Sequence, residues 1–276
     1  MDGYNFSVST LSNMTITIQG MATTTVGINF LLSFPLNSYV MWLIVSGTGS
    51  GVASEIFSLN LAVCEMFFCV GSVLLRSFCF MPSDLLGKVA CFVLGAVACA
   101  RPMFQCCICL EHHLAVLHPI IFLRSRPLRY RLMCSAVIWL VIFSISLICA
   151  TLVGFMIMFI LAMMSLPLCA VKMFCCLAIL RALKKPGPGA GPKRSSSNQA
   201  KMKAFKIVLV ILVYELVTYS PVFILVVLSS GNRLTSTEVI IGIAIVFSIM
   251  MATSFTQPLL HLHRVGKLPC FRLNTG

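Results

Sequence analysis

Four ionisable side chains interrupt runs of apolar residues in this sequence: Glu65, Arg101, Lys172 and Glu215. A charge inside a membrane costs about 2.5–3.5 kcal/mol on insertion scales, so such residues usually face a partner in the protein interior. Glu65 and Arg101 lie near the centres of consecutive apolar runs, which predicts a buried ion pair between them. Such a pair is either a switch element or a contact that only locks two helices together.

The other two charges are expected to behave differently. Glu215 lies six residues before Pro221, whose ring removes a helix hydrogen bond and promotes a kink, and it is expected to line a polar cavity. Lys172 is expected to reach the membrane surface with its long side chain. Prolines lie within several of the apolar runs, which is typical of kinked helix bundles, and they include Pro102, Pro167, Pro221 and Pro258.

The histidines do not form a metal-binding pattern. His112 and His113 are adjacent, so on a helix their side chains point about 100° apart, and no second helix carries ligands at positions i and i+4. The sequence also lacks a paired-carboxylate or nucleophile arrangement that would support catalysis. We therefore expect no metal, no cofactor and no enzymatic activity.

The composition places the chain in a membrane. Hydrophobic residues make up 59% of the 276 residues and charged residues only 10%, which leaves too little polar surface for a soluble protein of this size. The net charge of +13 would suggest nucleic acid in a soluble protein. In a membrane protein such a charge is explained by Lys and Arg gathered in the cytoplasmic loops. The expected partner is therefore the lipid bilayer and not nucleic acid.

The apolar runs predict seven transmembrane helices. About 20 apolar residues cross a hydrocarbon core roughly 30 Å thick, and residues 132–180 are long enough to cross twice with a tight turn near Thr151 to Gly154. We therefore predict an all-α membrane protein, a seven-transmembrane helix bundle over residues 21–262. Its predicted spans are residues 21–45, 56–75, 89–110, 132–151, 156–180, 207–228 and 239–260.

The distribution of positive charge predicts the orientation. With the N-terminus outside, fifteen of the twenty Lys and Arg residues lie in cytoplasmic segments, whereas six spans would separate them onto two sides. The extracellular tail, residues 1–20, then carries glycosylation sequons at Asn5 and Asn13. Residues 184–203, rich in Pro, Gly and Ser, are expected to form a flexible cytoplasmic loop, either a partner-binding and phosphorylation segment or a solvated linker. Residues 263–276 form a cytoplasmic tail.

Seven short motifs occur in the order found in one receptor family, and together they cover nearly the whole chain. They are Asn37, Asn60-Leu-Ala-Val-Cys-Glu65, Glu111-His112-His113 followed by His118-Pro119, Trp139, Pro167, Thr218-Tyr219-Ser220-Pro221 and Gln257-Pro258-Leu-Leu-His261. In these motifs the sequence resembles class A (rhodopsin-like) G-protein-coupled receptors. The resemblance implies a plasma-membrane protein that binds an unknown extracellular ligand and passes a signal to a heterotrimeric G protein.

The resemblance also assigns roles to individual residues. It implies a polar switch in the core and a surface that faces the G protein. The switch comprises Glu65, Arg101, Glu215, Tyr219 and Gln257, and the G-protein-facing residues are Glu111, His112, His113, Pro119 and His261. His112 replaces the arginine that engages the G protein in the family, which puts the usual coupling in question. Arg101 stands where the family has a sodium ligand, so its guanidinium is expected to replace the ion beside Glu65.

The cysteine assignments rest on the resemblance and stay open. Cys91 would bond a cysteine of the second outer loop, but that loop is almost absent. Cys149 and Cys169 are possible partners, Cys79 could pair locally with Cys91, or neither could pair. Cys270 resembles a palmitoylation site, or is an unmodified thiol.

Three hypotheses for function follow. The first is a receptor-like signalling protein. The second is an uncoupled or decoy receptor scaffold, suggested by His112 and the missing outer loop. The third is a small channel or carrier that uses Glu65, Arg101 and Glu215 as a polar pathway.

Overall fold

The chain folds into a bundle of helices in the computed structural model, which describes residues 2–47, 55–125, 128–151, 155–184, 192–231 and 233–265. Within these ranges the side chains of residues 2–18, 123–125, 155–158, 192–200, 236 and 263–265 are not described. The helices are α1 (Asp2–Val45), α2 (Ile56–Phe80), α3 (Asp84–Leu117), α4 (Pro119–Ser125), α5 (Leu128–Thr151), α6 (Phe155–Lys184), α7 (Pro192–Ser230), α8 (Ser236–Thr253) and α9 (Thr256–Val265).

The predicted seven-helix membrane bundle is confirmed. Seven segments of the described chain are helical, long and apolar enough to cross a membrane, and α5 and α6 are two of them, so residues 132–180 cross twice. The turn between these helices, residues 152–154, lies outside the described residues. Large apolar side chains such as Leu31, Leu140 and Phe174 are more than half exposed, as expected for a surface that faces lipid. The chain is a multi-pass α-helical membrane protein.

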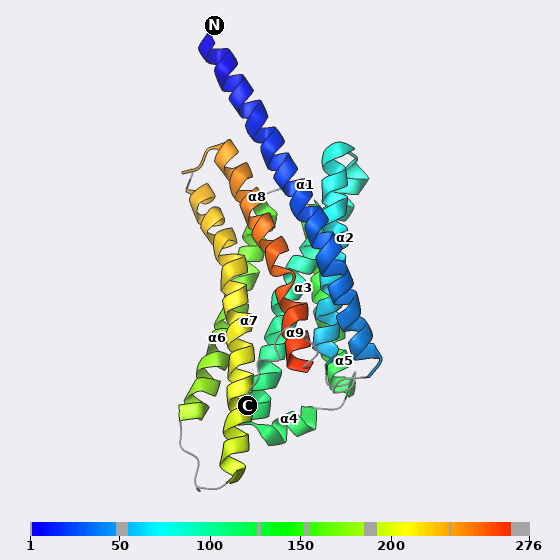
Figure 1. The fold of residues 1–276 in the computed structure, drawn as a ribbon, viewed down its shortest axis with the longest axis vertical. Helices are drawn as coiled ribbons and strands as arrows, with labels where there is room; N and C mark the ends of the chain where they lie inside the picture. The colour runs from blue at the N-terminus through cyan, green and yellow to red at the C-terminus, as the bar shows by residue number, and fades with distance from the viewer. Residues whose placement is uncertain are drawn as a thin grey trace, which may run out of the picture.

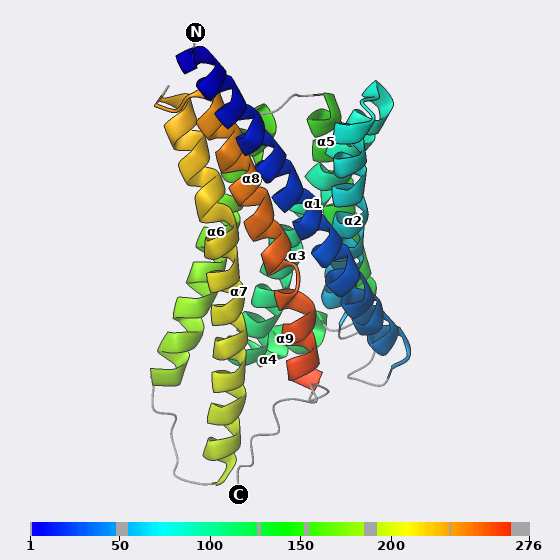
Figure 2. The same ribbon diagram turned by 45° about the horizontal axis from the view of Figure 1, so that its top comes forward.

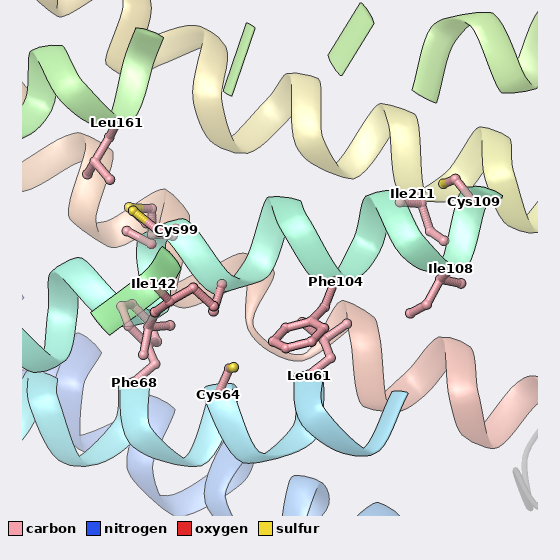
Figure 3. Close-up of a cluster of buried hydrophobic side chains, with 14 of the residues drawn as sticks. Leu61, Cys64, Phe68, Cys99, Phe104, Ile108, Cys109, Ile142, Leu161 and Ile211 are labelled. Atoms are coloured by element: carbon pink, nitrogen blue, oxygen red, sulfur yellow. The ribbon is translucent and has the colours of Figure 1, made fainter. Parts of the chain in front are cut away.

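Helix α3 lies at the centre of the bundle and packs against α2, α5, α6 and α7 (Figures 1 and 2). In its most apolar window 72% of the residues are buried, against 28% for α5, which lies at the periphery. The apolar core is built around this helix. In Figure 3 the buried ring of Phe104 lies between α3 and Leu61 of α2, while Cys109 and Ile211 meet where α3 packs against α7.

The seventh span is broken into two helices by its sequence. Pro258 has no backbone N–H to donate to the carbonyl four residues earlier. Helix α8 accordingly ends at Thr253 and α9 begins at Thr256. At its other end α8 starts with a capping box: the Thr235 hydroxyl accepts from the Glu238 backbone N–H at 3.4 Å, and the Glu238 carboxylate accepts from the Thr235 N–H at 2.7 Å. The break places Ser254 at a point where its side chain is turned into the bundle.

The segment 184–203, expected from the sequence to be a flexible loop, includes the first part of a helix. Helix α7 begins at Pro192, and only residues 185–191 lie outside the described part of this connection. Proline is favoured in the first turn of a helix, and the Gly and Pro residues of the segment all lie at or before position 192. The Lys, Gln, Ala and Met residues that follow are good helix formers. The N-terminal tail is likewise part of a helix, because α1 begins at Asp2.

One end of the bundle carries most of the positive charge, and we refer to it as the basic end. It includes Arg129 at the start of α5, Arg181 and Lys184 at the end of α6, and Lys203 and Lys206 near the start of α7. In Figures 1 and 2 it is the lower end, opposite the N-terminus.

Candidate functional site

A buried guanidinium joins three helices in the middle of the bundle. Arg101 of α3 donates to the carboxylate of Glu65 in α2, and neither side chain is exposed to solvent. It also donates to the hydroxyl of Ser254 at 2.9 Å and to the backbone carbonyl of Met250 in α8 at 3.5 Å. The guanidinium carbon lies 3.9 Å from the centre of the Phe68 ring. The predicted Glu65–Arg101 ion pair is therefore present, and α8 completes the site.

This arrangement does not fit a sodium ion beside Glu65. The carboxylate already accepts from the guanidinium, which keeps its positive charge under all ordinary conditions. A sodium ion at the same carboxylate would meet that fixed charge at short range in a medium of low dielectric constant, where repulsion is strong. Arg101 thus supplies the positive charge beside Glu65.

A tyrosine hydroxyl ties a fourth helix to the same region. Tyr219 of α7 donates from its hydroxyl to the backbone carbonyl of Ala98 in α3 at 2.9 Å, one turn from Arg101. The neighbouring Thr218 hydroxyl donates to the Thr253 hydroxyl of α8 at 3.3 Å. Pro221 lies two residues after Tyr219 and removes one backbone hydrogen bond of α7. The proline and the interhelix hydrogen bonds therefore lie within one turn of each other.

The expectation for Lys172 is wrong. Its side chain is fully buried and donates to the carboxylate of Glu215, so α6 and α7 are joined by a second buried ion pair. A lysine can reach the membrane surface only if its side chain faces lipid, and this one faces α7. The depth argument that found the first pair would have found this one: Lys172 lies twelve residues from the end of α6, and Glu215 lies at a similar distance from Lys201 in α7.

Two further glutamates at the basic end are in contact with basic side chains. The Glu111 carboxylate of α3 is 2.6 Å from the Arg131 guanidinium of α5. The Glu55 carboxylate, just before α2, is 2.6 Å from the His261 imidazole of α9, and both side chains are buried. Two of the residues expected to face a G protein are thus engaged within the bundle.

The remaining predicted residues of this surface lie close to α3. The ring of His113 lies 5.8 Å from Phe174 of α6 and 6.1 Å from His118, measured between centroids. His112 is the neighbouring residue on α3, and Pro119 opens the short helix α4. The structure therefore places these residues together at one end of the bundle.

The structure contains a small cavity with a mixed lining and a larger apolar one. The first, of about 40 Å³, is lined by residues that include Asn37, Ser58, Gln257 and His261. The second, of about 230 Å³, lies between α2, α3 and α5, and its lining is apolar: Cys64, Phe67, Phe92, Val93, Ala96, Val97, Trp139 and Phe143. The indole N–H of Trp139 donates to Asn60 at 2.8 Å, so it is not available to a ligand in this cavity.

The cysteines within the described residues are free thiols. Cys79 is exposed and Cys91 partly exposed, and neither is bonded to the other. Cys149 is buried against Gly95 of α3, where a Cβ atom built on the glycine would lie 3.0 Å from the cysteine Cβ. Cys169 is partly exposed. Cys270 and the side chains of Asn5 and Asn13 lie outside the described residues.

The described side chains include no group of three or more His, Cys, Asp or Glu residues placed to hold a metal ion. No protein-family model matches this sequence. No curated protein matches it either. The function is therefore argued from the buried polar site.

Proposed function

We propose that this chain is a receptor-like signalling protein of the plasma membrane, with its N-terminus outside and its basic end in the cytoplasm. It binds an extracellular ligand between its spans and transmits the change by helix movement. The observation that carries this proposal is the buried Arg101 site, which joins α2, α3 and α8 at one depth beside the Tyr219 contact to α7. Charged groups at that depth are costly, and in membrane proteins they commonly mark a functional site in the bundle interior.

The contacts around Arg101 suggest which helix moves. Arg101 has partners on α2 and α8, so these helices and α3 form one polar unit. Helix α7 is held to α3 by the Tyr219 hydrogen bond and to α6 by Glu215, and it contains Pro221. A ligand that displaces the outer half of α7 would break the Tyr219 contact first. The basic half would then pivot at the proline and open a surface for a cytoplasmic partner.

The uncoupled scaffold is the second candidate, and the basic end supplies the observation that favours it. Glu111 is bound to Arg131, His261 is bound to Glu55, and the position of the family arginine is His112. An imidazole lacks the planar five-donor group and the permanent charge of arginine. The protein could thus keep the fold and the switch while lacking the residue that engages the G protein.

One experiment separates the two candidates. The wild type, His112→Arg and His112→Lys are expressed in cells at matched surface levels, and basal G-protein activation is measured. A coupled receptor gives basal activity that Tyr219→Phe alters by severalfold, because the α3–α7 hydrogen bond is lost. Activity that appears only in His112→Arg, with His112→Lys silent, identifies an uncoupled scaffold that lacked the guanidinium.

A different outcome would overturn the proposal itself. Protease accessibility that places both chain ends in one compartment excludes seven spans in the proposed orientation. Ion flux through reconstituted vesicles that disappears in Glu65→Gln would instead identify a channel or carrier.

A further inference from the structure

The exposed cations of α6 and α7 at the basic end are matched in depth. Lys172 and Glu215 fix the antiparallel register of the two helices, because their side chains are in direct contact. Twelve residues further toward the basic end on each helix are Lys184 and Lys203, and nine residues from the pair are Arg181 and Lys206. At 1.5 Å per residue these cations lie about 14–18 Å from the buried pair.

That distance places the four cations at the membrane surface. Half of a hydrocarbon core is roughly 15 Å thick, so cations 14–18 Å from a pair near mid-membrane lie at the level of the lipid headgroups. The two spans also end in this region, one at Lys184 and the other beginning at Lys201. The four side chains are all exposed. We call them the four-cation patch.

Each helix turns from an apolar to a basic surface along a single stripe. On α6 the exposed residues Phe174 and Leu177 are followed at helical spacing by Arg181 and Lys184. On α7 the exposed residues Val213 and Val210 are followed in the same way by Lys206 and Lys203. Spacings of three and four residues keep such positions on one helix face. The cations therefore continue the faces of α6 and α7 that contact lipid tails.

Among the described residues, no acidic side chain forms an ion pair with a cation of the patch. There is no Asp or Glu in the sequence between Glu111 and Glu215. Glu111 itself is bound to Arg131, and Glu215 is bound to Lys172. The described residues therefore leave the patch open to a counter-charge from outside the chain, at headgroup depth and beside surfaces that contact acyl chains.

We infer that the four-cation patch of Arg181, Lys184, Lys203 and Lys206 is a binding site for an anionic phospholipid, its phosphate groups held between the ends of α6 and α7. Basic side chains next to a membrane span are attracted to acidic lipids, and several phosphates on one headgroup allow several cations to be used together. The site is independent of signalling, since it depends only on the register and exposure of these two helices.

The test uses the full chain purified in a neutral detergent. Short-chain phosphatidylinositol bisphosphate, phosphatidylserine and phosphatidylcholine are titrated separately, and bound lipid is counted by native mass spectrometry. Inositol trisphosphate supplies the headgroup without acyl chains, and an oligoglutamate peptide supplies acidic charge without phosphate. The test variant carries Arg181→Gln, Lys184→Gln, Lys203→Gln and Lys206→Gln.

A matched control variant carries Arg129→Gln, Lys193→Gln, Arg194→Gln and Lys201→Gln, which removes the same charge from other positions at the same end. We expect the bisphosphate lipid to bind best and phosphatidylcholine least. The test variant should lose affinity for the bisphosphate lipid by about 600-fold, at roughly fivefold for each of the four cations, and the control by less than tenfold. Thermal unfolding of both variants checks that they are folded.

Three results would overturn the inference. An equal loss in both variants means that general charge, and not this patch, attracts the lipid. Inositol trisphosphate that binds as tightly as the lipid means that the site takes a soluble phosphate. The peptide binding more tightly than any lipid means that the patch takes an acidic protein segment.

Discussion

Removal of the Glu215 carboxylate is expected to destabilise the protein more than removal of the Glu65 carboxylate. The two glutamates are both buried and each pairs with one cation, so their pairs look equivalent in a list of contacts. Their cations differ in what remains after Glu is replaced by Gln. Lys172 has no hydrogen-bond partner other than Glu215 among the described residues. Arg101 keeps the Ser254 hydroxyl, the Met250 carbonyl and the Phe68 ring.

The difference can be estimated from these contacts. A buried charge left without its partner costs about 3–5 kcal/mol, and this applies to Glu215→Gln. After Glu65→Gln the Arg101 charge is still partly stabilised. A hydrogen bond to a charged group contributes about 1.5–3 kcal/mol and a desolvated cation–π contact about 2 kcal/mol. These remaining contacts offset part of the cost of an unpaired charge, so Glu65→Gln should cost about 1–3 kcal/mol. At roughly 2–4 °C per kcal/mol, the melting temperature should fall by about 10 °C for Glu215→Gln and about 5 °C for Glu65→Gln.

Thermal unfolding of the purified chain in one detergent at neutral pH measures both variants. Lys88→Gln is the control, because the Lys88–Asp84 pair is well formed at 2.7 Å but largely exposed and should change the melting temperature by less than about 2 °C. The double variant Lys172→Met with Glu215→Met removes both charges and should recover most of the lost stability. If Glu65→Gln destabilises as much as Glu215→Gln, or if the double variant is no better than Glu215→Gln alone, the assignment of partners is wrong.

Three further predictions test separate parts of the structure. Because the Arg101 guanidinium already pairs with the Glu65 carboxylate, exchange of potassium for sodium should leave the melting temperature unchanged, and a shift of several degrees would show that an ion binds there. Gly95→Ala should destabilise by about 1–3 kcal/mol because its Cβ would lie 3.0 Å from a side chain of α5, whereas Gly27→Ala, with nothing within 4 Å, should be neutral or stabilising in the same unfolding assay. Thr235→Ala should cost about 1 kcal/mol through loss of the capping box, and Thr235→Ser should retain it; equal melting temperatures would argue against the cap.

The amino-acid sequence determined the architecture and part of the polar core. The lengths of the apolar runs predict how many times the chain crosses a membrane. The clustering of Lys and Arg predicts which connections lie on the same side. The Glu65–Arg101 pair was also predictable, because both charges lie at the centres of consecutive runs and have opposite sign. Each of these properties varies only along the membrane normal, which a sequence reports directly at 1.5 Å per residue.

Only the tertiary structure decided which way the side chains face around each helix. Lys172 could have reached the surface or turned inward, and its rotation toward α7 chose the second possibility. The share of Ser254 in the Arg101 site follows from the break between α8 and α9, and the Tyr219 contact depends on the approach of α7 to α3. Hydropathy gives depth in the membrane, whereas the angle of a residue about its helix and the identity of the neighbouring helix are set by packing across the whole bundle.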